Sequence, residues 1–259
     1  MSRIAITAAL LIAAVQVAPT SAATFLFVRH AESAANAGTA TTVEEFLDPP
    51  LTALGEQQAL SLVDVLAAYD VTSIYTSAYQ RTQATIAPTA AHFGLTPTAD
   101  ARTNEWYIGD IESLADIDSN SIYGVFAAWG AGDTSAKADL PNAESLDDMA
   151  ARVLPAWEEI IDAHADDDGV VVLVGHGAEM GYVMPFFAQN VSLDFAAAHP
   201  LDNTGIIQLE TINGQPYVTN WQGIEVAVPE PASWLMLAFG LGGLVGVARL
   251  GTRREKAAA

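Results

Sequence analysis

Two histidines and two arginines stand out in a chain that has few cations. Arg29 and His30 are adjacent and follow an apolar run, and His176 and Arg81 each follow another such run. Guanidinium groups bind phosphoryl oxygens through forked, charge-assisted hydrogen bonds. They also favour the neutral form of a nearby imidazole, which is its nucleophilic form. If the chain brings these four side chains together, they can perform phosphoryl chemistry.

The three apolar runs, 25–28, 71–76 and 170–175, are the elements that must position them. Their length and composition predict buried strands. A helix from Thr52, its N-cap, to about Tyr69 connects the first two, so we expect a βαβ unit with a parallel pair of strands. Ligands of open α/β sheets bind beyond the carboxyl ends of the strands. The sequence therefore predicts an α/β fold, a three-layer α/β/α sandwich around a mostly parallel sheet.

The remaining elements follow from hydrophobic periodicity and turn residues. A loop is expected over 33–50, and a cap of short helices and loops over 108–143. Further helices are expected over 79–93, ending at Gly94 with Pro88 kinking or interrupting it, over 143–165 and over 178–189, and a closing hairpin over 205–211 and 215–221.

The overall charge excludes several functions. The chain of 259 residues has a formal net charge of −21 and no cysteine. A domain this acidic would repel nucleic acid and anionic lipid surfaces. Without cysteine, neither a disulfide framework nor a thiolate nucleophile is available. Between residues 24 and 229 the cations are Arg29, Arg81, Arg102, Lys137 and Arg152.

Both ends of the chain read as processing segments. Residues 1–23 have a basic start, an apolar run and small residues, which is typical of a secretory signal peptide. Residues 226–259 contain Pro229-Glu230-Pro231, an apolar segment and a basic tail, and resemble a PEP-CTERM sorting signal. That resemblance implies a transmembrane helix, an exosortase-type processing enzyme as partner, and delivery to the envelope or extracellular matrix of a Gram-negative bacterium. Contact with a membrane is expected only through these two segments.

The domain between them, residues 24–225, resembles the histidine phosphatase superfamily, in its phosphoglycerate mutase-like branch. The motifs occur in the order of that family over about 25–210. They are Arg29-His30-Ala31-Glu32 with Asn36, Leu51-Thr52-Ala53-Leu54-Gly55, Thr76-Ser77-Ala78-Tyr79-Gln80-Arg81-Thr82, Asn104-Glu105, Pro141-Asn142-Ala143-Glu144-Ser145 and Val174-Gly175-His176-Gly177.

The resemblance implies a role for each site residue. His30 would attack phosphorus and become phosphohistidine, and Glu105 would protonate the leaving group and later activate water, with Asp110 and Glu112 as alternative acids. No metal or cofactor is implied, because a cationic pocket can supply the electrostatic stabilisation. The residues implied to hold the phosphoryl group are Arg29, Asn36, Arg81 and His176.

We therefore expect an exported phosphomonoesterase that acts on a small phosphorylated substrate. One alternative is a non-catalytic phosphate-binding module on the same fold, since Ala31 stands where the family usually has glycine. Another is a phosphotransferase of the phosphoglycerate mutase type. A third interpretation, a metal cluster of His30, Glu32, His176 and Glu179, is disfavoured by the neighbouring arginines.

Overall fold

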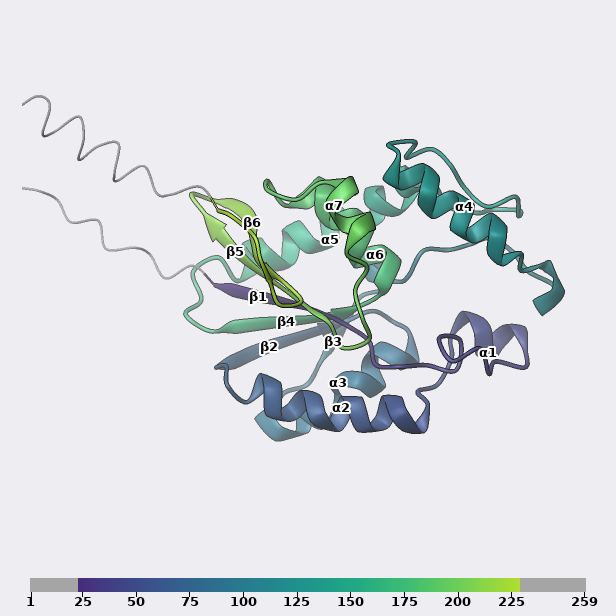
Figure 1. Cartoon of the computed structure of the whole chain (residues 1–259). Coiled ribbons are helices and arrows are strands. Elements are labelled where there is room, and N and C mark those ends of the chain that lie inside the picture. The colour runs from purple at the N-terminus through teal and green to yellow at the C-terminus, as the bar shows by residue number, and fades with distance from the viewer. Residues whose placement is uncertain (1–22, 229–259) are drawn as a thin grey trace, which may run out of the picture.

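The computed structural model describes residues 23–228 (Figure 1). The expected signal peptide and the expected C-terminal transmembrane helix therefore lie outside the described residues. Within residues 23–228, none of the helices combines the length and apolar character that a membrane span requires.

A seven-stranded sheet forms the centre of the molecule, with strand order β3-β2-β4-β1-β5-β6-β7. Its first four members in that order are parallel, and the other three continue antiparallel. The expectation of a mostly parallel core is confirmed. The strands are β1 (Thr24–Arg29), β2 (Val71–Thr76), β3 (Thr98–Ala99), β4 (Val170–Gly175), β5 (Ile206–Ile212), β6 (Gln215–Trp221) and β7 (Ile224–Glu225).

The predicted pairing of the first two strands was wrong in one respect. β1 and β2 run in the same direction, but β4 lies between them and pairs with both. β4 is buried at all six positions, so it is the most apolar strand and takes the central place. The consequence is that the strands leading to Arg29, His176 and Arg81 are direct neighbours.

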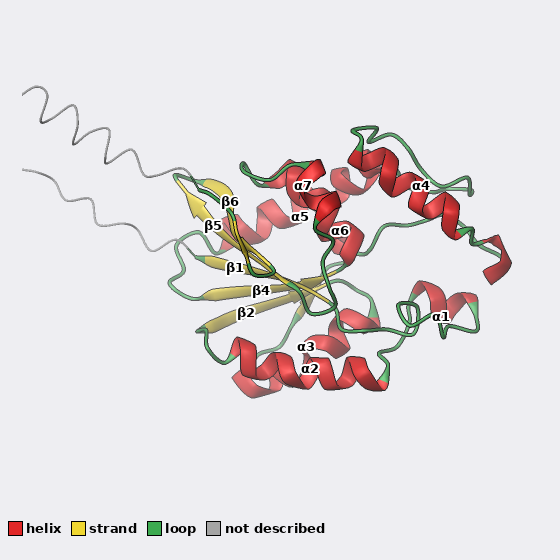
Figure 2. Ribbon diagram, in the orientation of Figure 1, coloured by secondary structure: helices red, strands yellow, loops and turns green. Residues whose placement is uncertain are grey.

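Helices cover both faces of the sheet, which confirms the three-layer architecture (Figure 2). Side chains of β1 alternate between two cores: Leu26 and Val28 pack under one layer, and Phe25 and Phe27 under the other. The first layer contains α2 (Ala53–Leu66) and α3 (Gln80–Phe93), and the second α5 (Leu146–Ala163), α6 (Gly177–Phe187) and α7 (Leu193–Ala198).

Local signals explain where these helices begin and end. Thr52 caps α2 as expected, by accepting a hydrogen bond from the Gly55 amide. α3 ends at Gly94 in the left-handed conformation, and it continues through Pro88. Ser145 begins α5 with a capping box. The hairpin of β5 and β6 turns at Asn213 and Gly214, both with positive φ.

The least regular part lies beyond the carboxyl ends of the parallel strands (Figure 1). The segment expected to be a loop over 33–50 contains a short helix, α1 (Val43–Leu47), which Thr42 caps. The expected cap over 108–143 consists of turns and two helical pieces, η2 (Leu114–Asp116) and α4 (Ser119–Gly130). A 3-10 turn, η1 (Ala101–Thr103), leads into it. Neither α1 nor α7 was expected, because five or six residues carry too little periodicity to predict a helix.

Candidate active site

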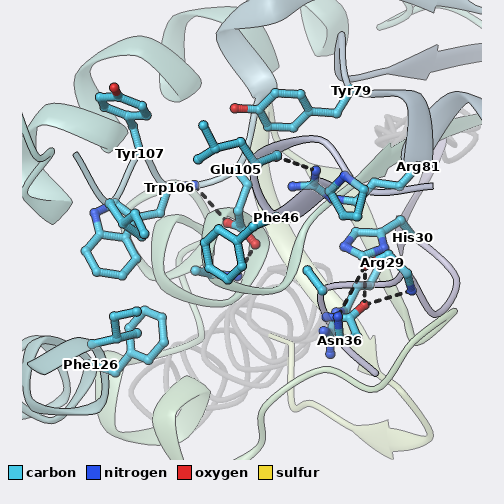
Figure 3. A pocket seen from close by; sticks show the side chains of 17 residues that line it. Arg29, His30, Asn36, Phe46, Tyr79, Arg81, Glu105, Trp106, Tyr107 and Phe126 are labelled. Carbon is cyan, nitrogen blue, oxygen red and sulfur yellow. Dashed lines mark hydrogen bonds between the residues drawn. The ribbon is translucent and has the colours of Figure 1, made fainter. Parts of the chain in front are cut away.

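A cavity of about 200 Å³ lies at the carboxyl edge of β1, β4 and β2 (Figure 3). Five of the six expected site residues line it. They are Arg29, His30, Asn36, Arg81 and Glu105. The sixth, His176, lies behind the wall, with its ring 5.3 Å from the ring of His30.

The ring of His30 is oriented by its own backbone. Nδ1 lies 2.7 Å from the carbonyl oxygen of Ala31. A carbonyl only accepts hydrogen bonds, so Nδ1 carries the proton of the neutral ring and Nε2 carries the lone pair. This is the tautomer that a nucleophile attacking through Nε2 requires.

Ala31 fits this backbone without strain. Its φ is not positive, so glycine is not needed for the backbone angle here. Its amide donates to Thr85 Oγ1 at 2.9 Å, and its side chain is fully buried and does not line the cavity. The substitution of alanine for the usual glycine therefore does not obstruct the site.

His176 is completely buried and packs edge-on against His30 and Tyr79. Its Nε2 lies 2.8 Å from Ser77 Oγ, and its Nδ1 has no hydrogen-bond partner in the described part of the chain. When the Ser77 hydroxyl donates to Nε2, the ring proton sits on Nδ1. His176 then offers an unused, buried donor beside the nucleophile.

Both histidines are held neutral. Burial lowers the pKa of His30 well below its ordinary value of 6.5, and the charge of Arg81 lowers it further. The pKa of His176 is lowered for the same two reasons, in the same order. The site thus holds two neutral imidazoles at neutral pH.

The two arginines are anchored from different segments. Arg29 donates through Nη1 to the carbonyl of Leu201, while its buried Nε has no partner among the described residues. A Cβ on residue 177 would lie 3.1 Å from that Nε, so the glycine at this position avoids a close contact with the guanidinium group. Arg81 donates to Leu47 O at 3.1 Å and lies 4.4 Å above the ring of Tyr79.

Burial lowers the pKa of both guanidinium groups, and the opposing charge of Glu105 raises it. Arginine stays protonated at any physiological pH. The carboxyl of Glu105 therefore partly compensates two buried cations.

Asn36 is oriented by its oxygen. Oδ1 accepts from the Ser33 amide at 3.2 Å and from Asn203 Nδ2 at 3.1 Å. Its own amide nitrogen, with two protons, remains for the cavity that it lines.

Glu105 is the one acidic side chain among the lining residues in the described part of the chain. Its Oε1 accepts from the Glu179 amide at 2.8 Å and from the Trp106 amide at 2.9 Å, and its Oε2 from the Ala178 amide at 3.2 Å. Asp110 and Glu112, the alternative acids, do not line the cavity. The geometry therefore favours Glu105 over both.

A half-buried ion pair holds the segment that carries Glu105. Arg152 donates to Glu144 at 2.7 Å and 2.8 Å, and to the carbonyls of Arg102, Asn104 and Glu105 at 2.7 to 3.0 Å. Glu144 also accepts from the Tyr107 amide at 3.0 Å. Arg152 thus holds the carbonyls, and Glu144 an amide, of the irregular backbone over 102–107.

Sequence reasoning missed three contributors to the site. Arg152 was counted as a cation, but no pattern indicated its inward direction. Ser77 belongs to a quoted motif, and its role toward His176 could have been inferred there. Asn203, which donates to His30 O at 3.0 Å, lies in a loop with no motif, so no signal could have found it.

The interpretation as a metal cluster has no geometric support within residues 23–228, where no three His, Cys, Asp or Glu side chains converge as ligands. Glu32 accepts from the Thr52 hydroxyl at 2.6 Å instead. Glu179 accepts from the His176 amide at 3.1 Å.

An α/β sandwich whose adjacent parallel strands end in histidines and arginines defines a class of phosphate-handling proteins that use histidine. The chain belongs to the histidine phosphatase superfamily (branch 1), whose family model matches residues 25–223. This is a phosphatase-type enzyme family. A second model, the PEP-CTERM protein-sorting motif, matches residues 227–254 and suggests export to the cell envelope through a sorting system.

Two relatives from the curated proteins and one solved structure illustrate the similarity. A glucosyl-3-phosphoglycerate phosphatase of Mycobacterium tuberculosis is 31% identical over 160 residues, covering 59% of this chain and 69% of the relative. A 2,3-bisphosphoglycerate-dependent phosphoglycerate mutase of Caulobacter vibrioides is 30% identical over 180 residues, covering 60% and 75%. The solved structure of a mycobacterial glucosyl-3-phosphoglycerate phosphatase with VO3 superposes with a TM-score of 0.65 at 26% identity, covering 78% of this chain and all of that one.

Proposed function

We propose that the protein is an exported phosphomonoesterase that works through a phosphohistidine on His30. The observation that carries the proposal is the orientation of His30: Nδ1 is tied to Ala31 O, and Nε2 is free beside two arginines. Glu105 lies across the same cavity.

In the first step the Nε2 lone pair of His30 forms a bond to phosphorus, and the bond from phosphorus to the leaving oxygen breaks. In the substrate complex the phosphoryl group supplies the negative charge beside the arginines, and Glu105 carries a proton. Glu105 gives that proton to the leaving oxygen, so the alcohol departs neutral. Oε2 of Glu105 has a single contact, at 3.2 Å, and is the oxygen with room for that proton. Arg29, Arg81, Asn36 and the Nδ1 donor of His176 would stabilise the charge on the phosphoryl oxygens.

In the second step water attacks phosphorus and gives a proton to Glu105, and the bond from His30 to phosphorus breaks. Inorganic phosphate leaves, and His30 and Glu105 return to their starting states. The sum is one phosphate ester and one water converted to one alcohol and one phosphate.

The test uses residues 24–228 or the full chain with p-nitrophenyl phosphate and a panel of phosphate esters in chelator. We expect turnover, an acid-labile phosphoenzyme on quenching, and competitive inhibition by vanadate, a mimic of the pentacoordinate phosphoryl group. His30→Ala should reduce kcat by about 10⁴-fold or more, since loss of a nucleophile removes the covalent path.

Two results would redirect the proposal. A well-folded protein with no turnover and no phosphoenzyme, but with measurable phosphate binding, would indicate the non-catalytic module. Return of the phosphoryl group to a second hydroxyl, in place of release, would indicate a mutase. The second is disfavoured because a mutase must retain an intermediate that bears two anionic groups.

We also propose that the domain comprises residues 24–225, that residues 1–23 are cleaved on export, and that an exosortase-type enzyme recognises residues 226–259. The support is the match to the sorting motif. Deleting 226–259 should redirect the protein from the envelope to the medium, as followed by fractionation. Unchanged envelope association would argue against sorting through this segment.

A further inference from the structure

We infer that the substrate has an apolar leaving group of aromatic character without a second negative charge. This inference rests on the proposed phosphomonoesterase activity and specifies its substrate class. It follows from the half of the cavity that the phosphoryl group does not occupy.

The cavity has two chemically different ends. In Figure 3, Arg29, His30, Asn36 and Arg81 gather on one side, and Trp106, Tyr107 and Phe126 on the other. Glu105 lies between them. Because Glu105 must reach the leaving oxygen, the rest of the leaving group extends toward the aromatic side.

The aromatic side offers ring surfaces but few polar atoms. Trp106 Nε1 donates away from the cavity, to Glu144 O at 2.7 Å, and the Tyr107 hydroxyl donates to Asp110. The polar handles of these two rings are thus already used. The other lining residues from this segment of the chain are apolar: Ile108, Ile122 and Phe126.

No cation in the described part of the chain remains to bind a second anion. Arg152 is occupied by Glu144 and by three carbonyls. Arg102 pairs with Asp100 and Glu159, each at 2.7 Å. Lys137 does not line the cavity. Arg29 and Arg81, at the other end, are the cations left for the phosphoryl group.

The cap that borders the aromatic end is acidic. Residues 106–130 contain no Lys, Arg or His, and they carry Asp110, Glu112, Asp116 and Asp118. A carboxylate or second phosphate on the leaving group would lose its hydration without gaining a partner, and would meet charges of its own sign. Phosphoglycerate-type esters, which carry such a carboxylate, should therefore be poor substrates.

The experiment compares phenyl phosphate with 4-carboxyphenyl phosphate, and with 4-(hydroxymethyl)phenyl phosphate, whose leaving group is uncharged and of similar size. We expect kcat/KM for the carboxylate to be lower by about tenfold or more than for either ester with an uncharged leaving group. Equal values for all three, or a preference for the carboxylate, would overturn the inference.

A positive charge placed on the cap should reduce this difference in kcat/KM between the esters. Ile122 lines the cavity from α4, so Ile122→Lys should raise kcat/KM for 4-carboxyphenyl phosphate relative to phenyl phosphate by about tenfold, whereas Ile122→Gln should not. Tyr123→Lys is the matched control, because Tyr123 is 70% exposed on the same helix and outside the cavity. It adds the same charge and should leave the ratio unchanged. A ratio that moves equally in both lysine variants would show a general field effect and contradict the inference.

Failure of the inference and failure of the proposed function are distinguishable. If the esters are hydrolysed without the expected order, the inference fails alone. If nothing is hydrolysed, the proposed function fails, and calorimetric binding of phenylphosphonate against 4-carboxyphenylphosphonate still tests the pocket. The first should bind more tightly, and equal affinities would overturn the inference without reference to turnover.

Discussion

The two ends of the cavity are built in different ways. At the phosphate end, Arg29 ends β1, His30 and His176 directly follow β1 and β4, and Arg81 opens α3 just after β2, so the register of the sheet positions these groups. At the aromatic end, the segment from 104 to 142 is mostly turns and short helical pieces. There, side-chain contacts such as the Arg152–Glu144 pair take the place of a backbone ladder.

This difference separates reaction from specificity. Groups on a rigid sheet edge can hold a transferring phosphoryl group, which every ester of this class presents in the same form. On the proposed function, the irregular cap would meet the variable part of the substrate. Substitutions at the phosphate end should therefore affect all esters alike, and those toward the cap should discriminate among them.

The largest effect in this comparison is expected at Arg81. Arg81→Gln should lower kcat for every ester by about a thousandfold, because it removes a charged donor from the developing phosphoryl charge. Arg81→Lys should recover only part of this, since it restores the charge without the fork. Steady-state kinetics on phenyl, alkyl and carboxyphenyl phosphates would measure it. A loss confined to one ester would contradict the division of roles.

Glu105 lies between the two ends of the cavity, at their junction. The loss of kcat on its substitution should depend on the leaving group of the ester. Glu105→Gln should lower kcat about a hundredfold for an alkyl phosphate, whose leaving oxygen needs a proton. For p-nitrophenyl phosphate, whose leaving group departs as an anion, the loss should be less than about tenfold. A plot of log kcat against leaving-group pKa should thus steepen in the variant. An equal loss for both esters would remove Glu105 as the proton donor and reopen Asp110 and Glu112.

The phosphate end was also the part that could be predicted from sequence. Apolar runs that stop at Arg29, His30 and His176 predict strands and a common edge from local pattern alone. The order of the strands could not be predicted in this way, because insertion of β4 between β1 and β2 depends on the packing of the whole sheet. The pattern indicated which residues would meet, though not which strands would be neighbours.

The cap could not be predicted in the same detail. Trp106, Ile122 and Phe126 read only as scattered apolar residues, and their common wall depends on tertiary contacts. The ring centroid of Phe126 lies 5.2 Å from that of Trp106 and 5.4 Å from that of Tyr182 in α6. The inward direction of Arg152 likewise depends on Glu144, eight residues earlier. Periodicity reports the face of a regular helix or strand, and it carries no information on how an irregular segment folds back.

Arg152 holds the backbone that carries Glu105, so the effect of its loss should be smaller than that of losing Glu105 itself. Arg152→Met keeps the length of the side chain but leaves Glu144, which is 19% exposed, without its partner. We expect a loss of about 2 kcal/mol in the free energy of unfolding. We also expect kcat to fall about tenfold for alkyl phosphates and less for p-nitrophenyl phosphate, because Glu105 is displaced. Double mutation of Arg152 and Glu105 should be no worse in kcat than Glu105→Gln alone, and additive losses would show that Arg152 acts independently.

The smallest effect concerns Glu179, which lies behind the junction and is fully buried. Burial raises the pKa of its carboxyl well above the ordinary value of 4.5, and the nearby charge of Glu105 raises it further. The folded state therefore retains this proton at pH values where the unfolded chain has lost it. As pH rises above 4.5, the unfolded state is favoured progressively, so the group lowers stability on the alkaline side.

The two histidines act in the opposite direction. Their pKa values are lowered in the fold, so the stability they confer is present above their ordinary value of 6.5 and is lost as pH falls below it. Glu179→Gln can keep the acceptor for the His176 amide while removing the titration. Urea unfolding from pH 5 to pH 9 should show that the variant gains stability relative to the wild type as pH rises, with the acid side unchanged. A constant difference across this range would mean that Glu179 is ionised in the fold, and that the junction between the two ends holds one more charge than its geometry indicates.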